Sequence, residues 1–221
     1  MANLFDILGP SMVGPSSSHT AGACRLGFVA QSLVGGRPDR AEIGLHGSFA
    51  MTGEGHGTKR AIVGGLLGMR PDDPGLRESL ARAPDEGLAF TISSIDLGEA
   101  AHPNTARIRA VRGELETVMT GCSVGGGRIL VQEIDGMPVA LSGSLPTLVL
   151  VGDDVPGTIA ELTGLLSARG LNLATMRVDR TGRGERALMT IEADADVPAD
   201  VAAELGELPW VHWVRTIGRL D

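Results

Sequence analysis

The last third of the chain alternates strands and helices so regularly that few folds can accommodate it. Four runs rich in apolar and β-branched residues predict strands, at 147–152, 173–180, 186–193 and 211–218. Between them, apolar residues at helical spacing predict two helices, at 155–170 and 198–208. The order strand–helix–strand–strand–helix–strand predicts a ferredoxin-like βαββαβ domain.

The first of these helices carries its own start and stop signals. Pro156 suits the first turn of a helix and Gly170 suits its C-terminal end. We expect the apolar face of this helix to consist of Ile159, Leu162, Leu165 and Leu166.

A boundary is predicted near Ser142–Pro146, and we expect two domains, at 1–143 and 147–221. Before the boundary, helices are expected at 20–35, 57–69 and 74–83. Strands are expected at 42–49, running into a loop, and at 88–95, 105–112, 115–121, 128–134 and 137–143. Asp135–Gly136 predicts a hairpin turn. The fold class is therefore α/β (α+β), with a mainly antiparallel sheet closing the first domain.

Charge and composition exclude several classes of function. The net charge is -8, so we expect no basic face that could bind nucleic acid. No apolar run approaches the roughly 20 residues that a membrane span needs, and the first residues lack the basic region of a signal peptide. We expect a cytoplasmic protein. The only cysteines, Cys24 and Cys122, cannot supply the four thiolates of an ordinary iron–sulfur cluster.

The stretch VGPSSSHTAGACRLG, residues 13–27, places hydroxyls and an imidazole directly before a predicted helix. A helix N-terminus has free N–H groups and a partial positive charge, which favour carboxylates and phosphates. One hydroxyl suffices for an N-cap, so the excess indicates a ligand site, although an elaborate cap is the alternative. The candidate ligand residues are Ser16, Ser17, Ser18 and Thr20, together with His19.

A second cluster, HGSFAMTGEGHGT, spans 46–58 and surrounds His56 with glycines. Such a loop can enclose a small polar molecule beside one imidazole, or simply make a tight turn with a structural histidine. The spacing matches neither the dinucleotide-binding fingerprint nor the P-loop. The candidate substrate-binding residues in this cluster are Ser48, Thr52, Gly53, Gly57 and Thr58.

A third cluster, HPNT, offers His102, Asn104 and Thr105 in a predicted loop. His19, His56 and His102 lack the spacing of a zinc motif, so we expect no metal ligands in this chain.

The GCSVG stretch matches the GxSxG consensus of the nucleophile elbow in serine hydrolases, but its predicted secondary structure does not. A strand is predicted after Ser123 where the elbow needs a helix, which disfavours this serine as a nucleophile.

The motifs GPSSSHTAGACRLG, HGSFAMTGEGHGTKRAIVGGLLG, HPNTARI and GCSVGGGRI, followed by the βαββαβ half, form a family pattern. The chain resembles the beta chain of the two-chain, iron–sulfur-dependent L-serine dehydratases over nearly its whole length. The resemblance implies an allosteric-substrate-binding-type domain followed by an ACT domain. It also implies a [4Fe–4S] cluster on a partner alpha chain, L-serine as substrate, oligomerisation through the ACT domain, and no pyridoxal phosphate.

On this resemblance we expect His56 to transfer the proton, because an imidazole pKa of about 6.5 lies near working pH. His19 and His102 would orient substrate or share the catalytic role with His56. In the ACT half, Gly157 and Asn172 would bind an effector. The chain departs from the family pattern at Lys59, where an acidic residue is common, and at Cys24, where a small residue is usual. The alternative is a regulatory amino-acid- or anion-binding protein without catalysis.

Overall fold

The computed structural model describes residues 11–53 and 55–220. The chain forms two compact units, 1–136 and 137–221, and each is treated by itself. Within the described part, no helix combines the length and the apolar character needed to cross a membrane.

A six-stranded sheet has the strand order β2-β1-β3-β4-β5-β6, and its strands β1 to β5 lie in the first unit. The strands are β1 (Arg40–Leu45), β2 (Ala89–Ser94), β3 (Thr105–Arg112), β4 (Leu115–Gly125), β5 (Arg128–Ile134) and β6 (Met137–Leu141). β1 and β2 run parallel, whereas β1–β3, β3–β4 and β4–β5 pair antiparallel. Asp135 and Gly136 both have positive φ, 50° and 79°, as the predicted Asp–Gly hairpin turn requires.

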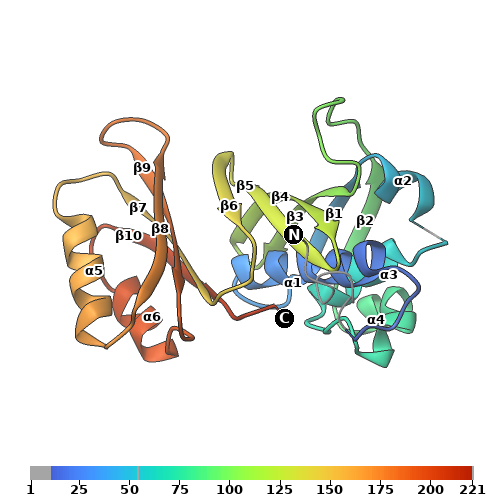
Figure 1. The fold of residues 1–221 in the computed structure, drawn as a ribbon, viewed down its shortest axis with the longest axis horizontal. Coiled ribbons are helices and arrows are strands. Elements are labelled where there is room, and N and C mark those ends of the chain that lie inside the picture. The colour runs from blue at the N-terminus through green and yellow to red at the C-terminus, as the bar shows by residue number, and fades with distance from the viewer. Residues whose placement is uncertain (1–10, 54, 221) are drawn as a thin grey trace, which may run out of the picture. The chain divides into compact units, whose positions relative to one another are not determined.

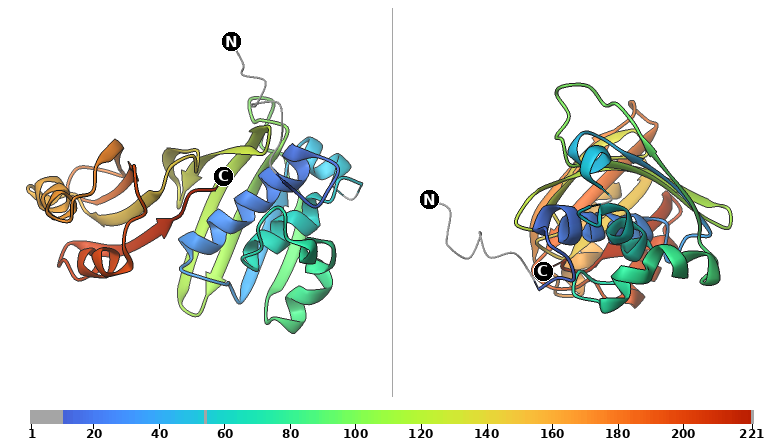
Figure 2. Two further views of the ribbon diagram at one scale, coloured as in Figure 1. Left: turned by 60° about the horizontal axis from the view of Figure 1, so that its bottom comes forward. Right: turned by 90° about the vertical axis from the view of Figure 1, so that its right-hand side faces the viewer.

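Helices cover one face of this sheet (Figure 2). They are η2 (Ser17–Gly22), α1 (Ala23–Leu33), α2 (Ser48–Thr52), α3 (Thr58–Leu66), η3 (Pro74–Glu78) and α4 (Ser79–Asp85). The apolar residues that predict α1, among them Leu26 and Ala30, are completely buried. The strand expected at 42–49 ends at Leu45, and the loop expected to follow it contains the short helix α2.

Two glycines let α1 and α3 approach until their backbones touch. A Cβ on Gly27 would overlap the carbonyl oxygen of Ile62, and one on Gly65 would overlap that of Cys24. Both neighbours are backbone atoms, which cannot move aside without shifting a whole helix. This close crossing fixes where α3 begins, and therefore where His56 and Gly57 lie.

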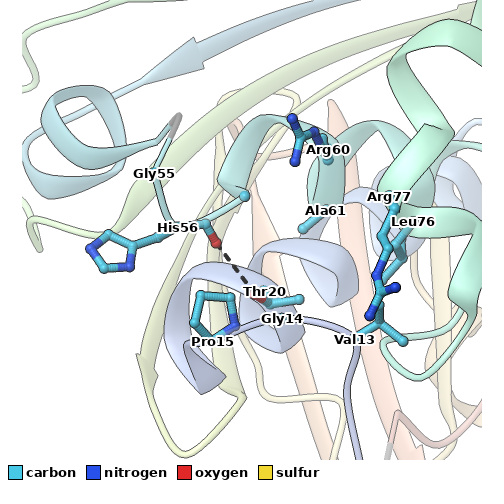
Figure 3. A pocket seen from close by; sticks show the side chains of 11 residues that line it. Val13, Gly14, Pro15, Thr20, Gly55, His56, Arg60, Ala61, Leu76 and Arg77 are labelled. Atoms are coloured by element: carbon cyan, nitrogen blue, oxygen red, sulfur yellow. Dashed lines mark hydrogen bonds between the residues drawn. The ribbon is translucent and has the colours of Figure 1, made fainter.

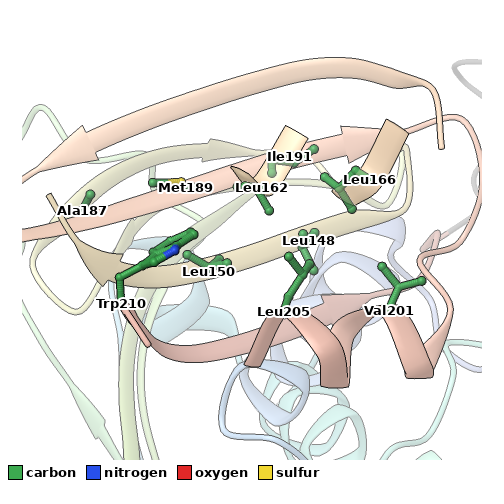
Figure 4. Packing of buried hydrophobic residues seen from close by; sticks show 10 residues of the cluster. All are labelled: Leu148, Leu150, Leu162, Leu166, Ala187, Met189, Ile191, Val201, Leu205 and Trp210. Carbon is green, nitrogen blue, oxygen red and sulfur yellow. The ribbon is translucent and has the colours of Figure 1, made fainter. Parts of the chain in front are cut away.

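The second unit is the expected βαββαβ domain. Its elements are β7 (Thr147–Asp153), α5 (Thr158–Ala168), β8 (Leu173–Arg180), β9 (Arg186–Ala193), α6 (Ala199–Gly206) and β10 (Val211–Ile217). Every neighbouring pair in the sheet β10-β7-β9-β8 is antiparallel. Figure 4 shows the core between helices and sheet, where Leu162 and Leu166 of α5 and Leu205 of α6 are completely buried.

Two details of α5 differ from the sequence prediction. The helix begins at Thr158 with Gly157 as its N-cap, so Pro156 lies before the helix and not in its first turn. Ile159 is 47% exposed and does not belong to the buried face. The predicted stop is confirmed, because the N–H groups of Gly170 and Leu171 bond back to Ser167 and Leu166 in the pattern of a Schellman motif.

Candidate functional site

The serine cluster folds into a π-helical turn, η2, that continues directly into α1. Ser16 is the N-cap, and its Oγ accepts the N–H of His19 at 3.2 Å. Ser17 and Ser18 therefore lie inside the helix, whereas the sequence led us to place them ahead of it. A π turn widens the helix and is frequent at functional sites.

The His19 ring lies within a group of hydroxyls that we call the His19 cluster: Ser16, His19, Ser48 and Thr52. Its Nε2 lies 3.2 Å from Ser48 Oγ and 3.1 Å from Thr52 Oγ1, and its Nδ1 lies 3.4 Å from Ser16 Oγ. The two ends of the short helix α2 thus supply both Nε2 partners. The edge of the ring packs against Phe49, with 5.2 Å between the ring centroids.

The surrounding hydrogen bonds assign a tautomer to His19. Thr52 Oγ1 donates its only hydrogen to the Ser48 carbonyl at 2.9 Å, so it accepts from Nε2–H. Nδ1 then accepts from the hydroxyl of Ser16. Burial, and next the neighbouring His56, lower the pKa of His19 below its ordinary 6.5, while a backbone hydrogen bond at Ser48 opposes the shift. This lowered pKa favours the neutral form of the ring at pH 7.

His56 is exposed, and its ring centroid lies 5.2 Å from that of His19. Its backbone is held in place because the buried Thr20 donates its hydroxyl to the His56 carbonyl at 3.4 Å. Gly57 follows as the N-cap of α3 with a φ of 77°, a conformation that favours glycine. The structure thus brings His19 and His56 together from two separate glycine-bounded segments.

Two further candidates from the cluster at 46–58, Gly53 and Thr58, are buried inside the protein. Gly53 is the buried C-cap of α2, and its carbonyl accepts the N–H of Thr58. The Thr58 side chain is completely buried and, among the described residues, its Oγ1 has no hydrogen-bond partner.

A pocket of about 360 Å³ opens beside His56 (Figure 3). Its lining comes from the 13–15 segment, η2, the 55–57 loop, α3 and η3, and comprises Val13, Gly14, Pro15, Thr20, Gly55, His56, Gly57, Arg60, Ala61, Leu76 and Arg77. Sequence analysis anticipated Thr20, His56 and Gly57 but missed Arg60 and Arg77. No sequence signal joins these two arginines, because only the packing of η3 against α3 makes them neighbours.

The HPNT loop lies against the start of α2. The N–H of Phe49 bonds to the Pro103 carbonyl at 3.3 Å, and a side chain on Gly47 would strike the backbone of Pro103. His102 Nδ1 accepts the N–H of Asn104 at 3.1 Å, and the Thr105 hydroxyl donates to the His102 carbonyl at 2.6 Å. These bonds stabilise the loop itself.

The described residues show no contact between the His102 ring and the His19 cluster, so the structure does not join all three histidines. Ser123 lies inside β4, completely buried, and a turn and β5 follow it. The strand–serine–helix elbow of a hydrolase is therefore absent from this part of the described chain.

The two residues expected to bind an effector in the second unit lie at loop edges. Gly157 has a φ of 98° as the N-cap of α5, with open space around its missing side chain. Asn172 precedes β8, and its Nδ2 donates to Asp194 at 2.6 Å. An effector that used this amide would have to displace Asp194.

The cysteines do not fit an iron–sulfur cluster. Both are buried, and Cys24 Sγ donates to the Met69 carbonyl at 3.2 Å. Burial raises the pKa of the Cys24 thiol to about 12 and also raises that of Cys122, whereas cluster ligation requires thiolates. Among the described residues, no group of three or more His, Cys, Asp or Glu side chains could hold a metal ion.

Similarity to known proteins identifies the family to which this chain belongs. Residues 2–85 match the family model "Serine dehydratase beta chain", and residues 147–209 match the ACT domain. The "Probable L-serine dehydratase, beta chain" of Bacillus subtilis is 43% identical over 217 residues, which cover 97% of each chain. The chain belongs to the serine dehydratase beta-chain family. The βαββαβ unit is its ACT domain.

Two further relatives support this membership. The "L-serine dehydratase, beta chain" of Peptoniphilus asaccharolyticus is 38% identical over 192 residues, 86% of each chain. The "L-serine dehydratase 1" of Escherichia coli is 34% identical over 173 residues, which cover 66% of this chain but only 37% of that protein. The matched segment therefore makes up little more than a third of the Escherichia coli protein.

Proposed function

We propose that this chain is the beta subunit of an L-serine dehydratase, which converts L-serine to pyruvate and ammonia together with an alpha chain. The observation that carries the proposal is the juxtaposition of the His19 cluster and the His56 ring in a chain that shares 43% of its residues, end to end, with a protein named as such a beta chain.

The reaction needs a base that removes the Cα proton of serine. It also needs a group that stabilises the β-hydroxyl as it leaves, because hydroxide is a poor leaving group. The Cα proton is removed and the β-hydroxyl departs with a proton as water. The resulting 2-aminoacrylate tautomerises to an imine, which water hydrolyses to pyruvate and ammonia. An imidazole near its ordinary pKa can accept and return a proton at neutral pH.

Within this scheme we assign the Cα proton to His56. Its ring is exposed, and no hydrogen bond from a described residue occupies its nitrogens. Both nitrogens of His19 are occupied by hydroxyls, so His19 acts as a neutral, fixed neighbour that orients substrate and His56. His102 would contribute by holding its loop against α2.

The substrate carboxylate would be held at η2. Ser17 and Ser18 are half-buried, and their hydroxyls make no hydrogen bond with other described residues, so both are available as donors. Ser16 and Thr20 have structural partners and would position the turn. Ser48, Thr52, Gly53, Gly57, Thr58, Asn104 and Thr105 would shape the surrounding loops.

The cofactor in this proposal is a [4Fe–4S] cluster held by the alpha chain, because the cysteines here do not fit it. Such a cluster would supply a Lewis acid for the departing hydroxyl. The proposal also divides the chain into domains at 1–143 and 147–221. The ACT domain would mediate oligomerisation and bind an effector at Gly157 and Asn172. The protein would be cytoplasmic, because free thiols such as Cys24 and Cys122 persist in that compartment.

The proposal is tested by assaying pyruvate with the two chains apart and together. The alpha chain from the neighbouring gene is prepared without oxygen, and iron is measured in each preparation. We expect iron only in the alpha chain and pyruvate only in the mixture. Pyruvate formed by the alpha chain alone, with this chain changing only its dependence on serine, would favour the regulatory alternative instead.

A further inference from the structure

The pocket beside His56 carries positive charge that no described residue neutralises. Arg60 reaches it from the first turn of α3 and Arg77 from η3 (Figure 3). Both side chains are exposed, and neither guanidinium makes an ion pair or a hydrogen bond with any described residue. None of the described lining residues is an aspartate or a glutamate.

A second hollow in the first unit provides the contrast. It measures about 270 Å³, lies on the sheet face opposite the helices and is also lined by two arginines, Arg107 and Arg109. There, Arg109 binds Glu42 at 2.6 Å and Glu116 at 2.7 Å. The protein therefore neutralises Arg109 internally, as expected in a chain with 27 acidic and 19 basic residues. In the pocket beside His56, neither Arg60 nor Arg77 has such a partner among the residues that the structure describes.

We propose that Arg60 and Arg77 form a binding site for a small oxyanion, a carboxylate or a phosphate, that carries no ammonium group. Guanidinium groups bind these anions through two parallel hydrogen bonds. The start of α3, at Gly57 and Arg60, adds the partial positive charge of a helix N-terminus. The inference concerns binding to this chain and does not depend on the proposed reaction.

The size and walls of the pocket limit the ligand further. A volume of about 360 Å³ is at the small end for ligand pockets, which suits a molecule of a few carbon atoms. Val13, Ala61 and Leu76 provide an apolar wall for a short carbon chain. A zwitterionic amino acid would bring its ammonium group towards two arginines with no described carboxylate to receive it, so it would bind more weakly than an oxo acid.

The site is separate from the His19 cluster but adjacent to it. Thr20 and His56, which are joined by a hydrogen bond, both line the pocket, whereas His19 does not. A bound anion would therefore lie next to the loop that carries His56 without using the hydroxyls around His19.

The test is calorimetric titration of the full chain, at low salt, with pyruvate, inorganic phosphate and L-serine in separate runs. Arg60→Gln and Arg77→Gln remove one guanidinium each. Arg128→Gln is the matched control, because Arg128 is also exposed and unpaired among the described residues but lies outside the pocket. Circular dichroism melting verifies that all three variants fold.

We expect one anion to bind per chain, with the tighter of pyruvate and phosphate identifying the ligand class. Each pocket variant should weaken that binding about tenfold, and Arg128→Gln should leave it unchanged. The proposal is overturned if neither anion binds, if the Arg60→Gln/Arg77→Gln double variant binds as the wild type does, or if the pocket variants weaken L-serine binding as much as they weaken pyruvate binding.

Discussion

At the scale of single residues, His19 shows how neighbours determine the state of an imidazole. Three hydroxyls assign its tautomer, and burial beside a second imidazole keeps it neutral. A neutral ring can orient a substrate without repelling the ammonium group of an amino acid. The positive charge of this region lies instead at Arg60 and Arg77, which line the adjacent pocket.

The first prediction concerns the pKa of His19 in the full chain. It should lie below 6.5, and His56→Ala should raise it towards that value, because the variant removes the electrostatic contribution of His56 while burial remains. Histidine ring resonances followed by NMR against pH measure this directly, with His212→Ala as the control in the second unit. A His19 pKa that does not change in His56→Ala would contradict the electrostatic account.

The same shift predicts the direction of a pH effect on stability. The unfolded chain takes up the His19 proton near pH 6.5, whereas the folded chain takes it up only at lower pH. The contribution of His19 is therefore fully present above about pH 6.5 and is lost as the pH falls from there through the lower, folded pKa. Replacing His19 with glutamine should reduce this loss in denaturant titrations at pH 5 to 7.

The candidate site was predictable from sequence in its residue types more than in their roles. Ser16, Ser48 and Thr52 were expected to bind substrate, but in the structure they bond to His19. A hydroxyl offers the same chemistry to a ligand and to a neighbouring ring, and only geometry distinguishes the two. Arg60 and Arg77 were missed because nothing in the sequence indicates which arginines lack a carboxylate partner.

At the scale of secondary-structure elements, regular spacing determined what could be predicted. The strands from β3 to β6 and all six elements of the ACT unit follow apolar alternation or helical periodicity, and they lie close to where the sequence places them. The five-residue helix α2 and the π turn η2 are too short to show a period. Both short elements position the His19 cluster.

The second prediction compares one substitution in two helices. Gly65→Ala should destabilise the protein by about 1–3 kcal/mol, because the new Cβ would overlap the Cys24 carbonyl in the neighbouring helix. Gly164→Ala should stabilise it by about 0.5–1 kcal/mol, because Gly164 lies on the exposed side of α5 with nothing near its missing side chain. Urea titrations followed by circular dichroism measure both.

A loss of stability in Gly164→Ala, or no loss in Gly65→Ala, would contradict the packing described for these helices. The comparison is informative because both variants add the same methyl group and the same helix propensity. The difference between them therefore isolates the contact between α1 and α3.

At the scale of the whole molecule, each unit has its own core. The cluster that contains Leu148, Leu162 and Leu205 lies entirely within the ACT unit. Both tryptophans of the chain, Trp210 and Trp213, also belong to this unit, and the chain has no tyrosine. Tryptophan fluorescence therefore reports on the second unit alone.

The third prediction uses this distribution to separate the two cores. Leu162→Ala should lower the midpoint of the fluorescence transition, at a cost of about 2–5 kcal/mol for a buried leucine. Leu26→Ala, at an equally buried position in α1, should leave that transition in place while lowering a transition seen by circular dichroism. Identical shifts of both signals in both variants would show that the units unfold as one.

The account depends most on the claim that this chain brings the proton-transferring imidazole to a reaction centre held by another chain. The direct measurement is kcat for pyruvate formation by the assembled complex containing His56→Ala, with iron content determined in the same sample and His212→Ala as control. We predict a loss of about a hundredfold or more, with iron unchanged and His212→Ala like the wild type. A His56→Ala complex that retains the wild-type kcat would contradict the claim.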